Sequence, residues 1–361
     1  MKQQGINHLI NIYDFAAAAR ATMPPDRYDF VSGGALDEQT LRENQAAFDR
    51  LQLYYRVLRQ ADSPSLTITL FGNTISLPII LAPTGSQMLT HPDGELAVRR
   101  AADQANTIMT VATTSTYPME TVCKAGTAPI WFQLYLFKDK GLNRDIVARA
   151  ESSGFQAIAL TVDSPVFGKR ERDIRNRYGL PPGLVYENLP FAGESDGRNV
   201  SAFMNENWKN DIGWSDVEWL SQETKLPVLV KGVCHPEDAH LSIEHGASGV
   251  WVSNHGGRQL DSAPATIDVL PGIARRVAQR VPIILDGGIR RGLDVLKAIA
   301  LGATAVAVGR PMLWGLAVAG QQGVTQILTI LKEELENGMT LCGCSNIQDI
   351  TKDLIFSRTQ I

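Results

Sequence analysis

The chain has 361 residues, 44% hydrophobic and 20% charged, which is typical of a soluble protein with one large domain or two modest ones. Its 34 basic and 38 acidic residues give a net charge of −4, and no apolar run is long enough to span a membrane, so neither a nucleic acid nor a membrane partner is expected. The start of the chain lacks a secretory pattern, and the four cysteines fit reduced thiols rather than a disulfide framework or a metal site, which predicts a cytoplasmic protein.

Residues 1–76 are predicted to form helices and a hairpin ahead of the main domain. Residues 11–60 have a helical composition. The second of three expected helices begins near Asp26 and stops at the turn Ser32-Gly33-Gly34, and the third runs from Asp37 through Phe48. The alternation in residues 66–70 and the turn that follows it indicate the hairpin.

From residue 77 to about residue 340, short apolar runs alternate with helix-type segments. Strands that are apolar on both faces and alternate with helices predict a parallel sheet. Eight such runs favour a closed (β/α)8 TIM barrel over an open doubly wound sheet, whose G-x-G-x-x-G fingerprint is absent, so residues 1–361 are interpreted as a single barrel domain. The runs begin near Ile79, Ile108, Trp131, Ala157, Val228, Val250, Ile283 and Ala305.

The connection between the fourth and fifth strands is unusually long, at about seventy residues. Its middle is rich in Gly, Asn, Ser, Asp and Glu. Long connections in compact domains are commonly functional, so residues 176–214 are predicted to be a mobile lid loop over the active site. An insertion without a role is the alternative.

The C-terminal ends of barrel strands face the active site, and here every end supplies a polar group or a glycine. Barrels commonly bind phosphate after their last two strands. We expect the glycines there, Gly287-Gly288 and Gly309, to clear space for an anion that Arg290 and Arg310 neutralise. A phosphate-bearing cofactor is therefore predicted. Lys231, at the end of the fifth strand, would face the pyrimidine edge of a flavin, unless it only pairs with a barrel carboxylate.

The sixth strand runs into residues 252–261, Val-Ser-Asn-His-Gly-Gly-Arg-Gln-Leu-Asp. Here His255 can carry a proton and Arg258 can grip a carboxylate through two hydrogen bonds. Together they predict a reacting centre for a small anionic substrate. A turn whose histidine and arginine are simply solvated is the alternative.

These motifs together closely resemble the FMN-dependent 2-hydroxy acid oxidases and dehydrogenases, a family that includes glycolate oxidase, lactate oxidase and mandelate dehydrogenase. The resemblance covers about residues 11–349 and implies FMN as the cofactor and a homotetramer as the assembly. The segments that carry it are 253–261 (SNHGGRQLD), 229–232 (LVKG), 285–288 (LDGG), 133–135 (QLY), 161–163 (TVD) and 308–310 (VGR).

The resemblance also implies a role for each site residue. His255 looks like the base that takes a proton from the substrate, with Asp163 stabilising its imidazolium. Arg258 and Arg170 look like the clamp on the substrate carboxylate, and Tyr135 like a hydrogen-bond partner of the substrate. The cofactor-binding residues by this resemblance are Pro83, Thr84, Gly85, Thr113, Gln133, Thr161, Lys231, Ser253, Asp286, Gly287, Gly288, Arg290, Gly309 and Arg310.

Several positions depart from the glycolate oxidase pattern. Phe30 stands where that pattern has a tyrosine whose hydroxyl touches the substrate carboxylate. Thr114 replaces a pocket tryptophan, Ala112 replaces a serine near the flavin, and Gly85 replaces an alanine. Thr114 and Gly85 are expected to leave room beside the substrate, where Phe167 adds an apolar wall. The predicted substrate is therefore lactate or a bulkier 2-hydroxy acid.

The resulting hypothesis is an enzyme that oxidises an (S)-2-hydroxy acid to the 2-oxo acid through FMN, with oxygen reoxidising the flavin to give hydrogen peroxide. The alternatives are a dehydrogenase that passes electrons to a quinone or a carrier protein, a non-redox flavin isomerase, and a barrel that only binds a ligand. The pairing of His255 with Arg258 disfavours the isomerase. The set Asp163, Arg170, His255 and Arg258 disfavours a barrel that only binds a ligand.

Overall fold

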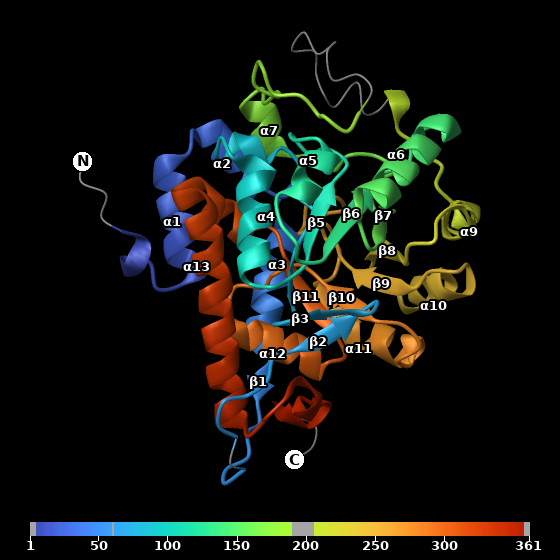
Figure 1. The fold of residues 1–361 in the computed structure, drawn as a ribbon. Coiled ribbons are helices and arrows are strands. Elements are labelled where there is room, and N and C mark those ends of the chain that lie inside the picture. Colours follow the sequence, from blue (N-terminus) through green and yellow to red (C-terminus); the bar gives the residue numbers. More distant parts are fainter. Residues whose placement is uncertain (1–4, 60, 190–205, 357–361) are drawn as a thin grey trace.

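The computed structural model describes residues 5–59, 61–189 and 206–356, and in this part of the chain eight parallel strands close into a barrel (Figure 1). Each strand pairs with the next in sequence, and the last pairs with the first. All eight predicted runs are strands, and the expected TIM barrel is confirmed. The strands are β4 (Ile79–Leu81), β5 (Met109–Ala112), β6 (Ile130–Leu134), β7 (Ile158–Thr161), β8 (Val228–Val233), β9 (Gly249–Val252), β10 (Ile283–Leu285) and β11 (Ala305–Val308).

The strands are buried on both faces because helices surround the barrel (Figure 1). Each predicted helix between strands is present, with ends that differ by a few residues: α4 (Gly94–Gln104), α6 (Lys140–Ser153), α10 (Pro236–Glu244), α11 (Thr266–Val277) and α12 (Gly292–Ala300). The sequence patterns did not reveal α5 (Met119–Lys124), α9 (Trp214–Glu223) or α13 (Arg310–Cys342) as helices. The last of these runs alongside α4 and the N-terminal helices in Figure 1 and contains a kink at Ala319 and Gly320.

Three helices precede the barrel, as predicted: α1 (Ile12–Thr22), α2 (Pro25–Ser32) and α3 (Gln39–Arg50). The helical expectation for residues 11–60 is wrong beyond Arg50. There the chain leaves α3 and forms the short strand β1 (Gln52–Leu53), which pairs antiparallel with β12 (Ile355–Phe356). A pairing partner about 300 residues away overrides local composition.

The predicted hairpin is formed by β2 (Ile68–Leu70) and β3 (Asn73–Ile75). Phe71, at its turn, has its ring centroid 5.6 Å from that of Trp131 in β6 and lies close to Gly249, the first residue of β9. The hairpin therefore closes the N-terminal end of the barrel and leaves the opposite end, where the strands run out, for the site.

The connection from β7 to β8 contains the short helix α7 (Glu171–Arg175), which packs against α2. Arg172 joins the two segments through Asp29, at 3.3 Å, and Glu38, at 2.6 Å. The predicted lid, residues 176–214, falls partly outside the described part of the chain, since residues 190–205 are not described. The lid stays a prediction.

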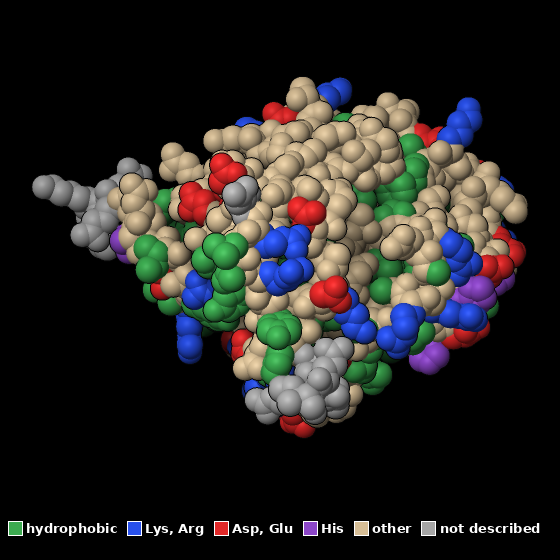
Figure 2. Space-filling model, turned by 90° about the horizontal axis from the view of Figure 1, so that it is seen from below, with side chains coloured by type: hydrophobic (Ala, Val, Ile, Leu, Met, Phe, Trp, Pro, Cys, Tyr) green, Lys and Arg blue, Asp and Glu red, His purple; other side chains and the backbone are tan. Residues whose placement is uncertain are grey.

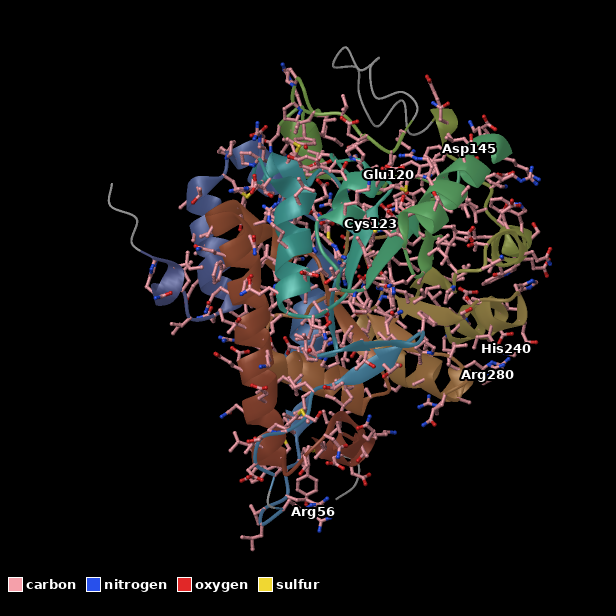
Figure 3. All side chains as sticks on the ribbon, in the orientation of Figure 1. Arg56, Glu120, Cys123, Asp145, His240 and Arg280 are labelled. Atoms are coloured by element: carbon pink, nitrogen blue, oxygen red, sulfur yellow. The ribbon has the colours of Figure 1, made fainter. Side chains whose placement is uncertain are left out.

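The face in Figure 2 carries basic, acidic and hydrophobic side chains side by side. No described helix is long and apolar enough to cross a membrane. The four cysteines, of which Cys123 is labelled in Figure 3, are free thiols. Among the described residues no group of His, Cys, Asp and Glu has the arrangement of a metal site.

Candidate active site

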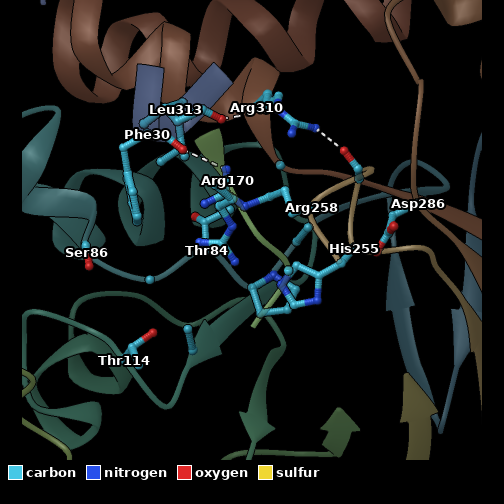
Figure 4. Close-up of a pocket in the computed structure, with 18 of the residues that line it drawn as sticks. Phe30, Thr84, Ser86, Thr114, Arg170, His255, Arg258, Asp286, Arg310 and Leu313 are labelled. Carbon is cyan, nitrogen blue, oxygen red and sulfur yellow. Dashed lines mark hydrogen bonds between the residues drawn. The ribbon is translucent and has the colours of Figure 1, made fainter. Parts of the chain in front are cut away.

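A cavity of about 390 Å³ opens at the C-terminal ends of the barrel strands, and residues from nearly every strand end line it (Figure 4). Most of the predicted site residues line this cavity. These are Phe30, Pro83, Thr84, Gly85, Thr114, Gln133, Tyr135, Phe167, Arg170, Lys231, His255, Arg258, Asp286, Gly287, Gly288, Arg290, Gly309 and Arg310. Four others, Thr113, Thr161, Asp163 and Ser253, do not line the cavity and lie behind residues that do.

His255 lies just after β9 and is held in an uncommon backbone conformation, with φ 57°. Gly256 and Gly257 continue the turn with φ 64° and 75°. A Cβ on Gly257 would lie 2.6 Å from the backbone nitrogen of Leu41 in α3, and one on Gly256 would lie 2.7 Å from Nη1 of Arg310. The positive φ favours glycine at both positions, and at Gly257 the backbone of α3 also leaves no room for a side chain.

Asp163 orients the His255 ring, with Nδ1 and Oδ1 3.0 Å apart. The Asp163 carboxylate also accepts from the Ser164 hydroxyl at 2.9 Å, while its Oδ2 is buried without a partner among the described residues. Because Nδ1 faces Asp163, Nε2 of His255 is the nitrogen available for proton transfer. The pair can accept a proton from a bound substrate and stabilise the resulting imidazolium.

The charge state of His255 gives a pH prediction. Burial lowers the pKa of the imidazole below its ordinary value, although Asp163 opposes this shift. The base is therefore neutral at pH 7, and activity is lost as pH falls and the ring becomes protonated. We expect kcat/KM to decline on the acid side through an inflection below about 6.5. A pH profile whose acid inflection lies above that value would contradict this assignment.

Arg258 and Arg170 lie close to His255 on the wall of the cavity (Figure 4). Nη1 of Arg258 donates to the backbone carbonyls of Phe30 and Gly33 at 2.6 and 3.2 Å. Burial, together with the neighbouring Arg170, holds the pKa of Arg258 well below its usual range. Among the described residues, no carboxylate lies within ion-pair distance of Arg258, and Nε of Arg170 is buried without a partner. Two buried guanidiniums with spare donors are suited to a carboxylate ligand.

Arg290 and Arg310 form a second basic group, at the ends of β10 and β11. Burial lowers the pKa of Arg290 to about 10, and burial together with Arg290 lowers that of Arg310 to about 9. Neither guanidinium pairs with a carboxylate among the described residues; Arg310 donates to backbone carbonyls, and Arg290 lies over the Trp314 ring. The N-terminus of α13 begins at the same place. Uncompensated positive charge beside a helix N-terminus fits the phosphate of FMN.

The glycines at this end of the barrel also allow neighbouring helices to pack closely. A Cβ on Gly288 would lie 1.9 Å from the carbonyl oxygen of Asn44, and one on Gly287 would lie 2.8 Å from Oγ1 of Thr266. Their missing side chains thus make room for α3 and α11, and both residues also line the cavity, so the space they leave for an anion stays a prediction. A Cβ on Gly309 would meet nothing closer than the Thr84 methyl, at 3.5 Å, so this glycine leaves space on the cavity side.

Lys231 combines the two roles weighed for it. It lines the cavity, and its Nζ, on β8, lies 3.5 Å from Oδ2 of Asp286, which follows β10 on the far side of β9. Ser253 bridges the pair, since it accepts from Lys231 at 3.1 Å and donates to Asp286 at 2.7 Å. Lys231 therefore has an ion-pair partner and still lines the cavity, which is compatible with the predicted contact to a flavin ring.

Gln133 is held by threonines on both neighbouring strands. Its carbonyl groups accept from Thr113, and its Nε2 donates to Thr161 at 3.0 Å. This row crosses β5, β6 and β7 below the cavity floor. Thr113 and Thr161 therefore orient Gln133, the member of the row that can reach a flavin ring.

The pocket differs from the sequence interpretation at Gly85. A Cβ there would lie 2.1 Å from Oγ1 of Thr114, so the threonine hydroxyl already fills the space that the missing methyl leaves. Phe30 stacks on Tyr178, with ring centroids 4.3 Å apart.

The sequence analysis missed several residues that line the cavity, because they lie on the β7–β8 connection, outside any motif. Trp208 packs edge-on against the rings of Tyr135 and Phe167, with centroids 4.1 and 4.8 Å away. Asp173 and Tyr178 also line the cavity. The spacing of Asp173 three residues after Arg170 was a usable signal, since such pairs face each other on a helix.

Comparisons with known proteins agree with this geometry. A family model described as FMN-dependent dehydrogenase matches residues 19–357. Glycolate oxidase 3 of Oryza sativa subsp. indica is 44% identical over 354 residues, covering 97% of this chain and 96% of the relative. Human 2-hydroxyacid oxidase 1 is 44% identical over 356 residues, with 96% of each chain covered.

Solved structures of mandelate oxidase are also similar. The complex with (S)-4-hydroxymandelic acid superposes with a TM-score of 0.92 at 40% identity, covering 96% of this chain and 98% of that one. The chain belongs to the FMN-dependent dehydrogenase family, and its cofactor is FMN.

Proposed function

We propose that this protein oxidises lactate or a bulkier (S)-2-hydroxy acid to the corresponding 2-oxo acid, with oxygen as the final acceptor and hydrogen peroxide as the second product. The observation that carries the proposal is the cavity in which the His255–Asp163 pair faces two buried arginines, Arg170 and Arg258. The oxidases among the similar proteins support the reaction and the acceptor.

Each residue of the site has a role that follows from its charge. Arg258 and Arg170 hold the substrate carboxylate, and Tyr135 adds a hydrogen bond from a buried hydroxyl whose pKa burial raises, so it stays protonated. His255 takes a proton from the substrate, and Asp163 stabilises the imidazolium that forms. FMN, when bound, supplies the acceptor for the two electrons.

The phosphate pocket gives a direct test. We expect the purified protein to be yellow and to release FMN on denaturation. Arg310→Met should lower FMN affinity by about tenfold or more, because it removes one of two uncompensated cations. Fluorescence titration of apoprotein measures the change. Release of FAD, or an unchanged affinity in the variant, would refute the pocket assignment.

The size of the substrate's side chain should control kcat/KM. Phe167, Trp208 and Tyr135 form an aromatic wall that glycolate would leave uncovered. Each methylene that fills an apolar pocket contributes roughly 1–3 kcal/mol to discrimination. We expect kcat/KM, followed by peroxide formation or by anaerobic bleaching, to rise from glycolate to lactate and further to phenyllactate or mandelate.

The wall itself supplies the control for this prediction. Trp208→Leu should reduce the preference for aryl substrates over lactate, whereas Trp219→Leu, on α9 and away from the cavity, should leave that preference unchanged. Efficiencies that are highest for glycolate and fall with side-chain size would rule out this substrate assignment.

The acceptor and the setting of the enzyme are further parts of the proposal. Rapid return of the oxidised spectrum when air is admitted to reduced enzyme supports an oxidase, and slow return favours a quinone or carrier protein. The four free cysteines fit a reducing compartment, so we place the enzyme in the cytoplasm. A homotetramer is expected by analogy with the family, and light scattering of the purified enzyme would test it.

A further inference from the structure

We propose that Asp173 selects substrates by charge, admitting 2-hydroxy acids with an uncharged side chain and rejecting those that carry a second carboxylate. The inference rests on the proposed function, since it concerns the same pocket. It assigns a role to a residue that lies outside the motifs of the reacting centre.

Asp173 lies on α7 and contributes to the wall of the cavity, with 18% of its side chain exposed. Its Oδ2 is 4.0 Å from Nη1 of Arg170, and Arg258 acts on it as a second nearby cation. Its carboxylate makes no hydrogen bond to another side chain in the described part of the chain.

The other carboxylates near the cavity already have partners. Asp163 is engaged by His255 at 3.0 Å, and Asp286 by Lys231 and Ser253. Asp173 is therefore the carboxylate on the described wall that faces the clamp arginines without serving another group.

This leaves a simple charge balance at the substrate end. Arg170 and Arg258 contribute two positive charges and the Asp173 carboxylate one negative charge; burial raises the pKa of Asp173, and the two arginines oppose this shift. One further anion neutralises the group, which is the single carboxylate of a 2-hydroxy monocarboxylate. A second carboxylate on the substrate would enter the field of Asp173 in a partly desolvated cavity, where like charges repel strongly.

The backbone that carries Asp173 is restrained, because α7 is held to Asp29 in α2 and to Glu38. Arg172 binds Asp29 and Glu38, and Asn176 donates to Asp29 at 2.9 Å. Tyr178 closes the helix by donating its backbone N–H to the Asp173 carbonyl at 2.8 Å. A charge fixed on a restrained helix discriminates better than one on a free loop.

The test compares two substrates of similar length, (S)-2-hydroxyhexanoate and (S)-2-hydroxyglutarate, in the FMN-loaded enzyme. Wild type should prefer the hexanoate strongly. Asp173→Asn, which keeps the shape and removes the charge, should shift the ratio of the two kcat/KM values toward the glutarate by about tenfold or more. Glu171→Gln, the same charge change on the same helix but outside the cavity wall, should leave the ratio unchanged.

The result for each variant can contradict the inference. An unchanged ratio in Asp173→Asn, or an equal shift in Glu171→Gln, would show that Asp173 does not select charge. Asp173→Ser is the second variant if the first does not fold, and wild type alone refutes the proposal if it uses both acids equally. Failure of wild type to oxidise either acid, with FMN bound, would instead reject the proposed function.

Discussion

His255→Gln should retain FMN and lose nearly all reduction by substrate. Glutamine keeps a polar side chain at the turn but cannot accept the proton, and positioned proton transfer typically contributes about 10²–10⁴-fold to rate. Because the variant leaves Arg290 and Arg310 in place, cofactor binding is expected to persist. Anaerobic stopped-flow measurement of flavin bleaching gives the rate of the reductive step directly.

A second histidine provides the control. His240 lies on the outer surface beside Arg280 (Figure 3), so His240→Gln should reduce the flavin at the wild-type rate. Near-native bleaching in His255→Gln would remove His255 from the mechanism. Loss of FMN from that variant would show that the turn, rather than the imidazole, is what the substitution damages.

Arg258→Lys should lower kcat/KM strongly, although the substitution keeps the positive charge. Arg258 serves the carbonyls of Phe30 and Gly33 and still has donors to offer the cavity, whereas an ammonium cannot form a two-pronged contact with a carboxylate. Hydrogen bonds to charged groups contribute about 1.5–3 kcal/mol each, so kcat/KM should fall by about 10- to 100-fold or more.

Arg280→Lys is the matched exchange on the surface, where the guanidinium pairs with Glu244, and it should change nothing in the kinetics. Rescue of Arg258→Ala by added guanidinium would support the assignment further. If Arg258→Lys keeps the wild-type half-saturation and rate, the carboxylate clamp must be assigned to other residues.

The strands and the reacting turn were predictable because their causes are local. Apolar runs of four to six residues on both faces of a strand leave few alternatives to a buried parallel sheet. His255 and Arg258 follow such a run directly, so their side chains had to reach the end of the barrel where the strands run out.

The parts that sequence reasoning missed depend on contacts between distant segments. β1 forms only because β12 lies beside it, and Trp208 reaches the cavity by packing on Tyr135 and Phe167. The space at Gly85 could not be judged without knowing that the Thr114 hydroxyl occupies it. No periodicity in the chain encodes such neighbours.

The contacts of Arg310 with the end of α2 have a consequence for the order of folding. Arg310 donates to the carbonyl of Val31 at 3.1 Å and to that of Gly33 at 2.8 Å, across 279 and 277 residues of chain. Contacts of such high sequence separation form late, after the intervening chain is in place. During synthesis these two hydrogen bonds cannot form until Arg310, just after the eighth strand, has left the ribosome, so the part of the pocket that Arg310 and the end of α2 share is completed only after all the barrel strands have been made.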